Sequence, residues 1–326
     1  MDGMFAIAAL LLTVLLTAVL NKILIPALRR VKLGQKILEV GPNWHKYKEG
    51  TPTMGGITFI LPTAAITVVA AIASDFDVRL WTVVGLALVS ALTGFVDDYV
   101  KLFKHTNKGL TAIQKLILQF ASVIAFLAVD ALVFGRGTSV SLAGNEVDFG
   151  SWYYIISLPL AVYVINASNL TDGIDGLEVS VSGLMITFFA VVLAISGKTG
   201  GSDMILICSA IGGCIGFFIF NHHTAQIFMG DTGSLYLGGL VVGLAYYYKI
   251  EIALIPITLV WIIEGLSVVL QVVYFKLTKK RLFKMAPIHH HFEKCGWSEN
   301  KIVAVWCLVT AASCTAAYFM IRNTLV

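Results

Sequence analysis

Charged residues are scarce in this chain of 326 residues. Lys, Arg, Asp and Glu together make up 13% of the sequence, whereas hydrophobic residues make up 58%. Soluble domains are about 25% charged. A water-soluble protein of this length has no core large enough for so many apolar side chains, so the composition excludes one. The small net charge of +4 gives no reason to expect nucleic acid as a partner.

Cysteine is also rare, with five residues in the whole chain. Cys208, Cys214, Cys307 and Cys314 fall inside apolar runs, and Cys295 falls in a polar loop. This placement excludes a disulfide framework of the secreted type. Internal repeats, low-complexity stretches and a separate soluble segment are missing too, so residues 1–326 are predicted to form a single transmembrane domain.

Long apolar runs, by contrast, recur along the entire chain. A helix needs about 20 apolar residues to cross the hydrocarbon core of a bilayer. Strands of a membrane barrel alternate in polarity, whereas these runs are apolar on all sides, so we expect an all-α polytopic membrane protein. The expected spans, about ten in number, are Met4–Leu24, Pro52–Ala73, Leu80–Phe95, Ile113–Phe134, Trp152–Ile165, Leu177–Ile195, Met204–Phe220, Leu235–Tyr248, Ile252–Phe275 and Ile302–Ile321.

The distribution of Lys and Arg predicts the orientation. Most of the 23 basic residues lie in the segments 22–48, 101–115 and 276–301, which share one side of the membrane if the N-terminus is outside. Basic loops favour the cytoplasm. We therefore expect both termini outside and the polar motifs described below on the cytoplasmic face.

Adjacent carboxylates occur at Asp97 and Asp98, with Lys101 one helical turn further on. On a helix this lysine neighbours both acids, and two abutting carboxylates favour a cation or a shared proton between them. An acidic helix end with a surface ion pair is an equally good interpretation.

Two further loops on the same face carry polar groups without the surrounding positive charge. In the segment 166–176, Asn166, Asn169, Asp172 and Asp175 recur every third residue, which gathers amide and carboxylate groups on one helical face, although these residues also form ordinary turns. In the segment 221–235, Asp231 is the single acid and lies between two glycines. It suits Mg²⁺ bound together with substrate phosphates, and equally the cap of the next helix.

The last polar loop joins a basic run, 276–284, to three consecutive histidines, His289, His290 and His291. Adjacent side chains diverge, so a zinc site is disfavoured and phosphate contacts are the better interpretation. Within the preceding span, Pro256 and Gly265 are expected to bend the helix and open a cleft to lipid. Glu264, deep in that span, is expected to hydrogen-bond a neighbouring helix rather than to do chemistry.

Taken together, these acids, lysines and histidines on one membrane face predict phosphoryl transfer between polyanionic reactants, with Mg²⁺ as the bridging charge. One reactant is expected to be a phosphorylated membrane lipid. An ion-coupled transporter is the rival from another class, but it requires carboxylates near the midplane, and only Glu264 lies there.

Five strings, in order, resemble the phospho-N-acetylmuramoyl-pentapeptide transferase family, within the polyprenyl-phosphate N-acetylhexosamine-1-phosphate transferases. They are 48–56 (KEGTPTMGG), 97–101 (DDYVK), 166–177 (NASNLTDGIDGL), 228–235 (FMGDTGSL) and 286–293 (APIHHHFE). The resemblance implies transfer of phospho-MurNAc-pentapeptide from UDP-MurNAc-pentapeptide to undecaprenyl phosphate, giving lipid I and UMP, in the bacterial cytoplasmic membrane. A sister transferase for another N-acetylhexosamine 1-phosphate is the nearest alternative.

The same resemblance implies roles for individual residues. Asp97, Asp98 and Asp231 are expected to be catalytic, with Asp231 holding the Mg²⁺ ion. The oligomeric state stays open, a homodimer being one option. The residues expected to bind substrate are Lys48, Thr53, Lys101, Asn169, Asp172, Asp175, Asn221, Phe228, Gly230, Gln271, His289, His290 and His291.

Overall fold

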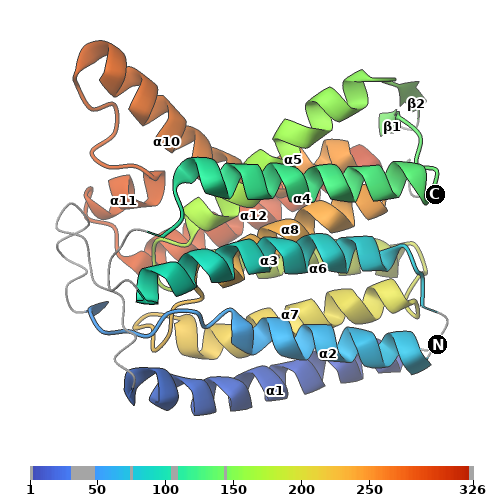
Figure 1. Ribbon diagram of the computed structural model, residues 1–326, viewed down its shortest axis with the longest axis horizontal. Coiled ribbons are helices and arrows are strands. Elements are labelled where there is room, and N and C mark those ends of the chain that lie inside the picture. The colour runs from blue at the N-terminus through green and yellow to red at the C-terminus, as the bar shows by residue number, and fades with distance from the viewer. Residues whose placement is uncertain (1–2, 31–47, 74–75, 104–108, 143–144, 323–326) are drawn as a thin grey trace.

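The computed structural model describes residues 3–30, 48–73, 76–103, 109–142 and 145–322, and long helices lying side by side dominate it (Figure 1). The helices are α1 Gly3–Arg30, α2 Ile57–Ala73, α3 Leu80–Phe103, α4 Ala112–Leu132, α5 Trp152–Thr171, α6 Leu177–Ile195, α7 Ser202–Asn221, α8 Gly230–Tyr247, the 3-10 turn η2 Glu251–Ala253, α9 Leu254–Ile257, α10 Leu259–Thr278, α11 Ile288–Glu293 and α12 Glu299–Ile321.

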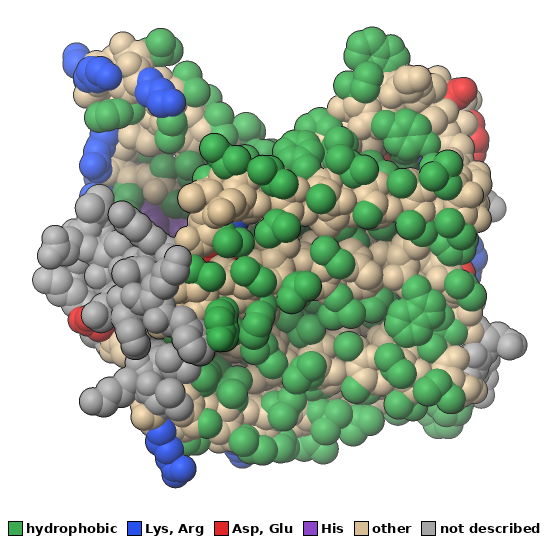
Figure 2. Space-filling model, in the orientation of Figure 1, with side chains coloured by type: hydrophobic (Ala, Val, Ile, Leu, Met, Phe, Trp, Pro, Cys, Tyr) green, Lys and Arg blue, Asp and Glu red, His purple; other side chains and the backbone are tan. Residues whose placement is uncertain are grey.

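Within the described residues, eight of these helices are long and apolar enough to cross a membrane: α1, α3, α4, α5, α6, α7, α10 and α12. The two remaining expected spans correspond to α2, which is shorter, and to α8, which lies inside the bundle. Apolar side chains are spread over the face of the molecule seen in Figure 2. Exposed apolar residues include Ile72 and Leu132, which are 82% and 85% exposed. This is the surface of a multi-pass membrane protein, as the composition predicted.

Helix α8 forms the centre of the core. Every residue from Thr232 to Tyr246 is buried. Its glycines permit close contact with several neighbours, because a Cβ at Gly239 would lie 2.8 Å from Ser90 Oγ on α3 and one at Gly238 would lie 2.4 Å from Ser168 Oγ on α5. Glycine lowers the hydropathy of this helix and at the same time lets α3 and α5 pack directly on its backbone.

The expected span Ile252–Phe275 is broken. The turn η2 and the short α9 end at Ile257, and α10 begins at Leu259, just after Pro256. The helix α10 continues through Gly265 to Thr278, and Gly265 packs against Tyr163. The far half of α10 stands away from the bundle, and the molecule is hollowed beside it (Figures 1 and 2). The predicted interruption is therefore confirmed next to Pro256, whereas at Gly265 the helix is not interrupted.

The first helix begins and the last helix ends at the same end of the bundle (Figure 1), as an even number of spans requires. A two-stranded antiparallel hairpin, β1 Ser139–Leu142 and β2 Asn145–Asp148, also lies at that end. The sequence analysis did not predict this hairpin. The polar motifs gather at the opposite end, where the C-terminal ends of α3, α5 and α7 meet the N-terminal ends of α4, α8 and α12.

Candidate active site

Three carboxylates converge where the end of α3 meets the start of α8. Oxygen atoms of Asp97, Asp98 and Asp231 lie within 4.8 Å of one another. Asp97 and Asp98 are buried, whereas the side chain of Asp231 is 15% exposed. The structure thus brings together the three acids that the sequence analysis expected to be catalytic, although 133 residues separate Asp98 from Asp231.

Two lysines offset part of the negative charge of this cluster. Lys101 Nζ lies 2.6 Å from Asp97 Oδ2, 3.8 Å from Asp98 Oδ1 and 3.2 Å from Asp231 Oδ2. Lys115 Nζ, from the first turn of α4, lies 3.0 Å from Asp97 Oδ2 and 2.5 Å from Asp231 Oδ2. From the sequence, Lys115 is expected among the cytoplasmic cations but not in the site. The only signal available was its position, since no motif surrounds it.

Asp98 holds the start of α8. Its Oδ1 accepts a hydrogen bond from the backbone N–H of Asp231 (3.2 Å), and its Oδ2 accepts from the backbone N–H (3.0 Å) and the hydroxyl (2.7 Å) of Thr232. A carboxylate at a helix N-terminus satisfies amides that lack helical partners. Gly230 has a φ of +72°, and a Cβ there would lie 2.5 Å from Asp98 Oδ2, so glycine is required at this contact. Asp98 therefore fixes the direction of the neighbouring Asp231 side chain.

The carboxylate of Asp97 is held by the segment that precedes α4. Its Oδ1 accepts a 2.7 Å hydrogen bond from the backbone N–H of Leu110. A Cβ on Gly109 would lie 2.3 Å from the same oxygen, so the chain passes directly over the carboxylate. The other oxygen, Oδ2, faces both lysines.

The segment before α2 pairs with the loop before α8. Phe228 N–H donates to the Pro52 carbonyl (2.8 Å), and the amides of Gly55 and Gly56 donate to the carbonyls of Phe228 (2.8 Å) and Met229 (2.9 Å). This pairing brings two of the five sequence strings together. It places Thr53 beside Gly230, where a Cβ would lie 3.0 Å from Thr53 Oγ1, and leaves the Phe228 side chain partly exposed.

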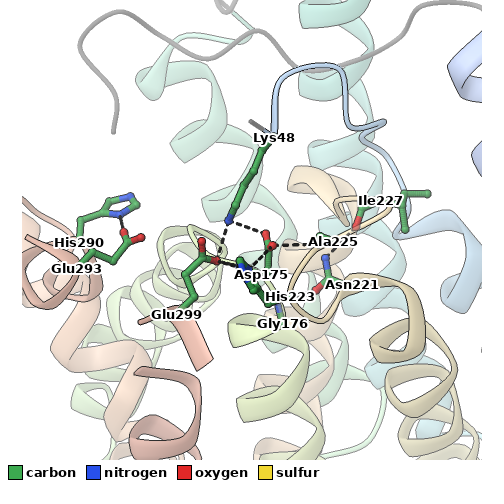
Figure 3. Close-up of polar contacts among 10 residues, drawn as sticks. All are labelled: Lys48, Asp175, Gly176, Asn221, His223, Ala225, Ile227, His290, Glu293 and Glu299. Atoms are coloured by element: carbon green, nitrogen blue, oxygen red, sulfur yellow. Dashed lines mark hydrogen bonds and ion pairs between the residues drawn. The ribbon is translucent and has the colours of Figure 1, made fainter. Parts of the chain in front are cut away.

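A second buried cluster surrounds Lys48 (Figure 3). Lys48 Nζ lies 2.7 Å from Asp175 Oδ1 and 2.7 Å from Glu299 Oε2. His223 Nδ1 lies 3.2 Å from Asp175 Oδ2, which also accepts the Ala225 amide at 3.0 Å. Lys48 and Asp175 were expected substrate contacts and do lie together. The sequence analysis did not single out Glu299 and His223, because neither stands in a motif whose chemistry distinguishes it from an ordinary helix or loop end.

Three more of the expected residues lie in or beside the turn between α5 and α6: Asn169 in the last turn of α5, Asp172 in the turn itself, and Asn221 at the end of α7. Asn169 Nδ2 donates to Ser234 Oγ on α8 (2.9 Å), and Asn221 Oδ1 accepts from the Gly176 amide (3.2 Å). Burial, then the neighbouring charges of Asp231 and Asp98, raise the pKa of the Asp172 carboxyl to about 8. This turn thus connects directly with α7 and α8 and lies within electrostatic reach of the three carboxylates.

The three histidines have three different environments. His289 is fully buried, with Nδ1 3.0 Å from Glu264 Oε2, while Glu264 Oε1 accepts from Trp306 Nε1 at 2.7 Å. Glu264 thus hydrogen-bonds neighbouring elements, as predicted. His290 Nδ1 lies 2.6 Å from Glu293 Oε2. His291 Nδ1 accepts from the Lys284 amide at 3.1 Å, and this contact leaves the other ring nitrogen as the donor.

Gln271 lies on α10, and its side-chain oxygen is used locally. It accepts hydrogen bonds from the backbone amides of Leu282 (3.1 Å) and Phe283 (2.8 Å). These bonds fold the segment after α10 back onto the helix. The structure does not link Gln271 through these contacts to the carboxylate cluster.

The carboxylate cluster has the composition of a divalent-cation site. Hard oxygen ligands are those that Mg²⁺ prefers, and it usually takes one or two carboxylates together with phosphate oxygens. Asp231 is the most exposed of the three acids, and the oxygens of Asp98 are already occupied by Thr232 and the Asp231 amide. The residues present therefore fit a magnesium ion held mainly by Asp231, with two lysines ready to meet phosphate.

Comparison with known proteins agrees with this geometry. Residues 80–249 match the model of glycosyl transferase family 4, and residues 48–60 match signature 1 of the phospho-N-acetylmuramoyl-pentapeptide-transferases. The chain is 41% identical over 317 residues to the phospho-N-acetylmuramoyl-pentapeptide-transferase of Clostridium perfringens (strain 13 / Type A), covering 96% of this chain and 97% of the relative. Identity to the Heliobacterium modesticaldum enzyme of that name is 45% over 287 residues, or 86% of each chain. Identity to that of Bacillus subtilis (strain 168) is 42% over 305 residues, covering 91% and 92%. With its acids, lysines and histidines gathered at one end of a membrane-spanning helix bundle, the chain belongs to the phospho-N-acetylmuramoyl-pentapeptide-transferase family.

Proposed function

We propose that this protein transfers phospho-MurNAc-pentapeptide from UDP-MurNAc-pentapeptide to undecaprenyl phosphate, forming lipid I and UMP, in the bacterial cytoplasmic membrane and with Mg²⁺. The observation that carries the proposal is the meeting of Asp97, Asp98 and Asp231 with Lys101 and Lys115 at one end of the bundle. Two phosphorylated reactants repel each other, so a site that brings them together needs positive charge, which the two lysines and a cation held by the acids would supply.

In the proposed reaction, an oxygen of the lipid phosphate bonds to the phosphorus that carries the sugar, and the bond from that phosphorus to UMP breaks. The second ionisation of a phosphate monoester lies near pH 6, so the lipid phosphate is mostly a dianion at neutral pH. A strong base is therefore unnecessary. Asp97, between Lys101 and Lys115, orients the phosphate or accepts its residual proton.

Mg²⁺, when bound, supplies charge neutralisation between the phosphates of the two reactants. In this proposal Asp231 holds the ion. Asp98 keeps Asp231 in place through its bonds to the start of α8, and the lysines take phosphate oxygens. The nucleotide-sugar substrate is bound, in this proposal, by Lys48, Asp175, Asn221 and Phe228. The Phe228 ring stacks on uracil.

The hollow beside α10 suits the polyprenyl chain. Val269, Val272 and Val273 on α10 are 46–49% exposed, and the far half of this helix stands away from the bundle (Figure 1). Charged residues follow at its end in the segment 276–284. A lipid tail lying along α10 would place its phosphate toward the carboxylate end.

The direct test uses purified protein with UDP-MurNAc-pentapeptide, undecaprenyl phosphate and Mg²⁺. We expect UMP release that depends on all three additions, and its absence would contradict the proposal. Substituting UDP-N-acetylglucosamine tests the sister-transferase alternative, which predicts equal or faster release. A phosphorylated enzyme trapped from UDP-substrate in the absence of lipid would contradict the single displacement.

A further inference from the structure

Glu299, in the first turn of α12, is shared by several parts of the chain. A single oxygen, Oε2, accepts a hydrogen bond from Lys48 Nζ (2.7 Å) and another from the backbone amide of Asp175 (3.0 Å), and lies 3.8 Å from His223 Nδ1. These partners come from the segment before α2, the α5–α6 turn and the α7–α8 loop. Glu299 is therefore the point at which four regions distant in sequence are tied together (Figure 3).

The cluster around Glu299 is buried and charged. Side-chain exposure is 6% for Lys48, 0% for Asp175 and 8% for Glu299. Buried charges are stable only when paired, and removing one partner leaves the others uncompensated. The position of Lys48 thus depends on both carboxylates.

The same cluster contains a group that resembles a cation site. One ligand atom each from Asp175, His223 and Glu299 lie within 4.8 Å of one another. The Lys48 ammonium, however, already lies 2.7 Å from each of the two carboxylates. A metal ion there would repel this lysine, whose side chain is only 6% exposed. Lys101 and Lys115 beside the other carboxylate cluster are 32% and 21% exposed and can turn toward solvent or phosphate. The geometry therefore favours a protein-supplied cation beside Asp175 and Glu299.

Lys48 is joined to the carboxylate site through a short stretch of chain. Residues 52–56 follow it and pair with Phe228 and Met229, which immediately precede Gly230 and Asp231. Asp175 likewise accepts the amide of Ala225 in the same loop. A displacement of Lys48 or of the α5–α6 turn would therefore also displace the loop that carries Phe228.

From these contacts we infer that Glu299 is a positioning residue for the nucleotide-sugar site: it holds Lys48 and the Asp175 turn in the arrangement that binds the UDP-linked substrate. The inference rests on the function proposed above. Glu299 acts through Lys48 and Asp175 and touches no reacting atom, so its loss weakens binding of the nucleotide substrate more than it slows turnover.

The test compares Glu299→Ala and Glu299→Gln with Ser298→Ala as the matched control. Ser298 caps the same helix, since its Oγ accepts from the Lys301 amide at 3.3 Å, and its loss weakens that end of α12 without removing a contact to Lys48. We expect Glu299→Ala to raise the Kd for UDP-MurNAc-pentapeptide, measured calorimetrically without lipid, by about tenfold or more. The kcat at saturating substrates falls less than about threefold. Glu299→Gln keeps the volume and one acceptor oxygen and has an intermediate Kd, whereas Ser298→Ala lowers the Tm and leaves the Kd unchanged.

A double-mutant cycle with Lys48→Met separates positioning from general destabilisation. If Glu299 acts in part through Lys48, the loss of affinity in the double variant is clearly smaller than the sum of the two single losses. Additive losses, or equal Kd values for Glu299→Ala and Ser298→Ala, would overturn the inference. If the wild-type protein releases no UMP in the assay described above, the proposed function fails instead, so the two failures are distinguishable.

Discussion

Individual acidic residues in this protein have separable roles set by their contacts. Both oxygens of Asp98 accept hydrogen bonds from the start of α8, and Asp97 lies beside two lysines. Asp231 is the most exposed of the three acids. The pattern of these acids alone leaves an ordinary acidic helix end equally possible, and it is the resemblance of the strings around them that predicts their importance. The sequence cannot assign the roles of Asp98 and Asp231, since these depend on contacts between residues more than a hundred positions apart.

The Asp172 carboxyl should make stability depend on pH. Its pKa is raised to about 8 by burial and by nearby carboxylates, so the folded protein holds a proton that the unfolded chain releases near pH 4. Stability should therefore fall as the pH rises from about 4 to 8. Thermal unfolding in detergent with EDTA should show this fall in the wild-type protein and a smaller one in Asp172→Asn.

Asp148 provides a control of opposite sign. Hydrogen bonds from the Thr138 hydroxyl and from the Gly150 amide lower the pKa of the Asp148 carboxyl. The stability that this carboxylate contributes to the folded protein is therefore present at neutral pH and is lost on acidification. Asp148→Asn should therefore lower stability at neutral pH and leave the decline toward pH 8 unchanged. If the stability of Asp172→Asn falls with rising pH as steeply as that of the wild-type protein, a group other than Asp172 causes the pH dependence.

Lys115 is the residue of the carboxylate site that no motif indicated. Because its ammonium contacts Asp97 and Asp231, Lys115→Met should lower kcat by about 100-fold, the usual effect of removing one charge-stabilising donor. UMP release at saturating substrates measures this. Lys198→Met, at the opposite end of the bundle, is the control and should retain full activity; a Lys115→Met variant as active as Lys198→Met would remove this lysine from the site.

At the scale of elements, the sequence predicts most helices well because their apolar runs are long. Helix α6, for example, has the expected bounds Leu177–Ile195. The errors have physical causes. Helix α8 begins five residues before its apolar run because Asp98 supplies partners for its first amides, and the hairpin β1–β2 is too short to give a pattern. The break at Thr258 follows Pro256, whereas Gly265 serves packing.

The contact between α3 and α8 determines whether the site can form. A Cβ on Gly94 would lie 2.1 Å from the Asp231 carbonyl oxygen, whereas one on Gly85 of the same helix meets nothing within 4 Å. Gly94→Ala should therefore separate the two helices, destabilise the protein by about 3 kcal/mol and abolish transfer. Gly85→Ala should instead gain up to about 1 kcal/mol from helix propensity.

Unfolding midpoints and UMP release for both variants check this expectation. Equal unfolding midpoints and equal rates of UMP release for Gly94→Ala and Gly85→Ala would show that α3 and α8 do not approach as closely as described. A Gly94→Ala variant that is stable but inactive would instead confine the effect to the orientation of Asp231.

At the scale of the whole molecule, charge distribution predicts which end faces the cytoplasm, and the structure adds that the site lies at the basic end. Cys295 is an exposed thiol at that end, whereas Cys214 and Cys314 are buried. A membrane-impermeant maleimide should label the protein in inside-out vesicles and not in intact cells. Cys295→Ser should remove the labelling, and labelling of intact cells through Cys295 would reverse the proposed orientation.

The central claim is that three carboxylates at the junction of α3 and α8 form one cation-dependent centre with Asp231 as the principal ligand. The most direct measurement is the Mg²⁺ dependence of UMP release by the wild-type protein and by Asp231→Asn. The account predicts that this substitution raises the Mg²⁺ concentration for half-maximal activity by at least about tenfold and lowers the maximal rate. An unchanged magnesium titration in Asp231→Asn would contradict it.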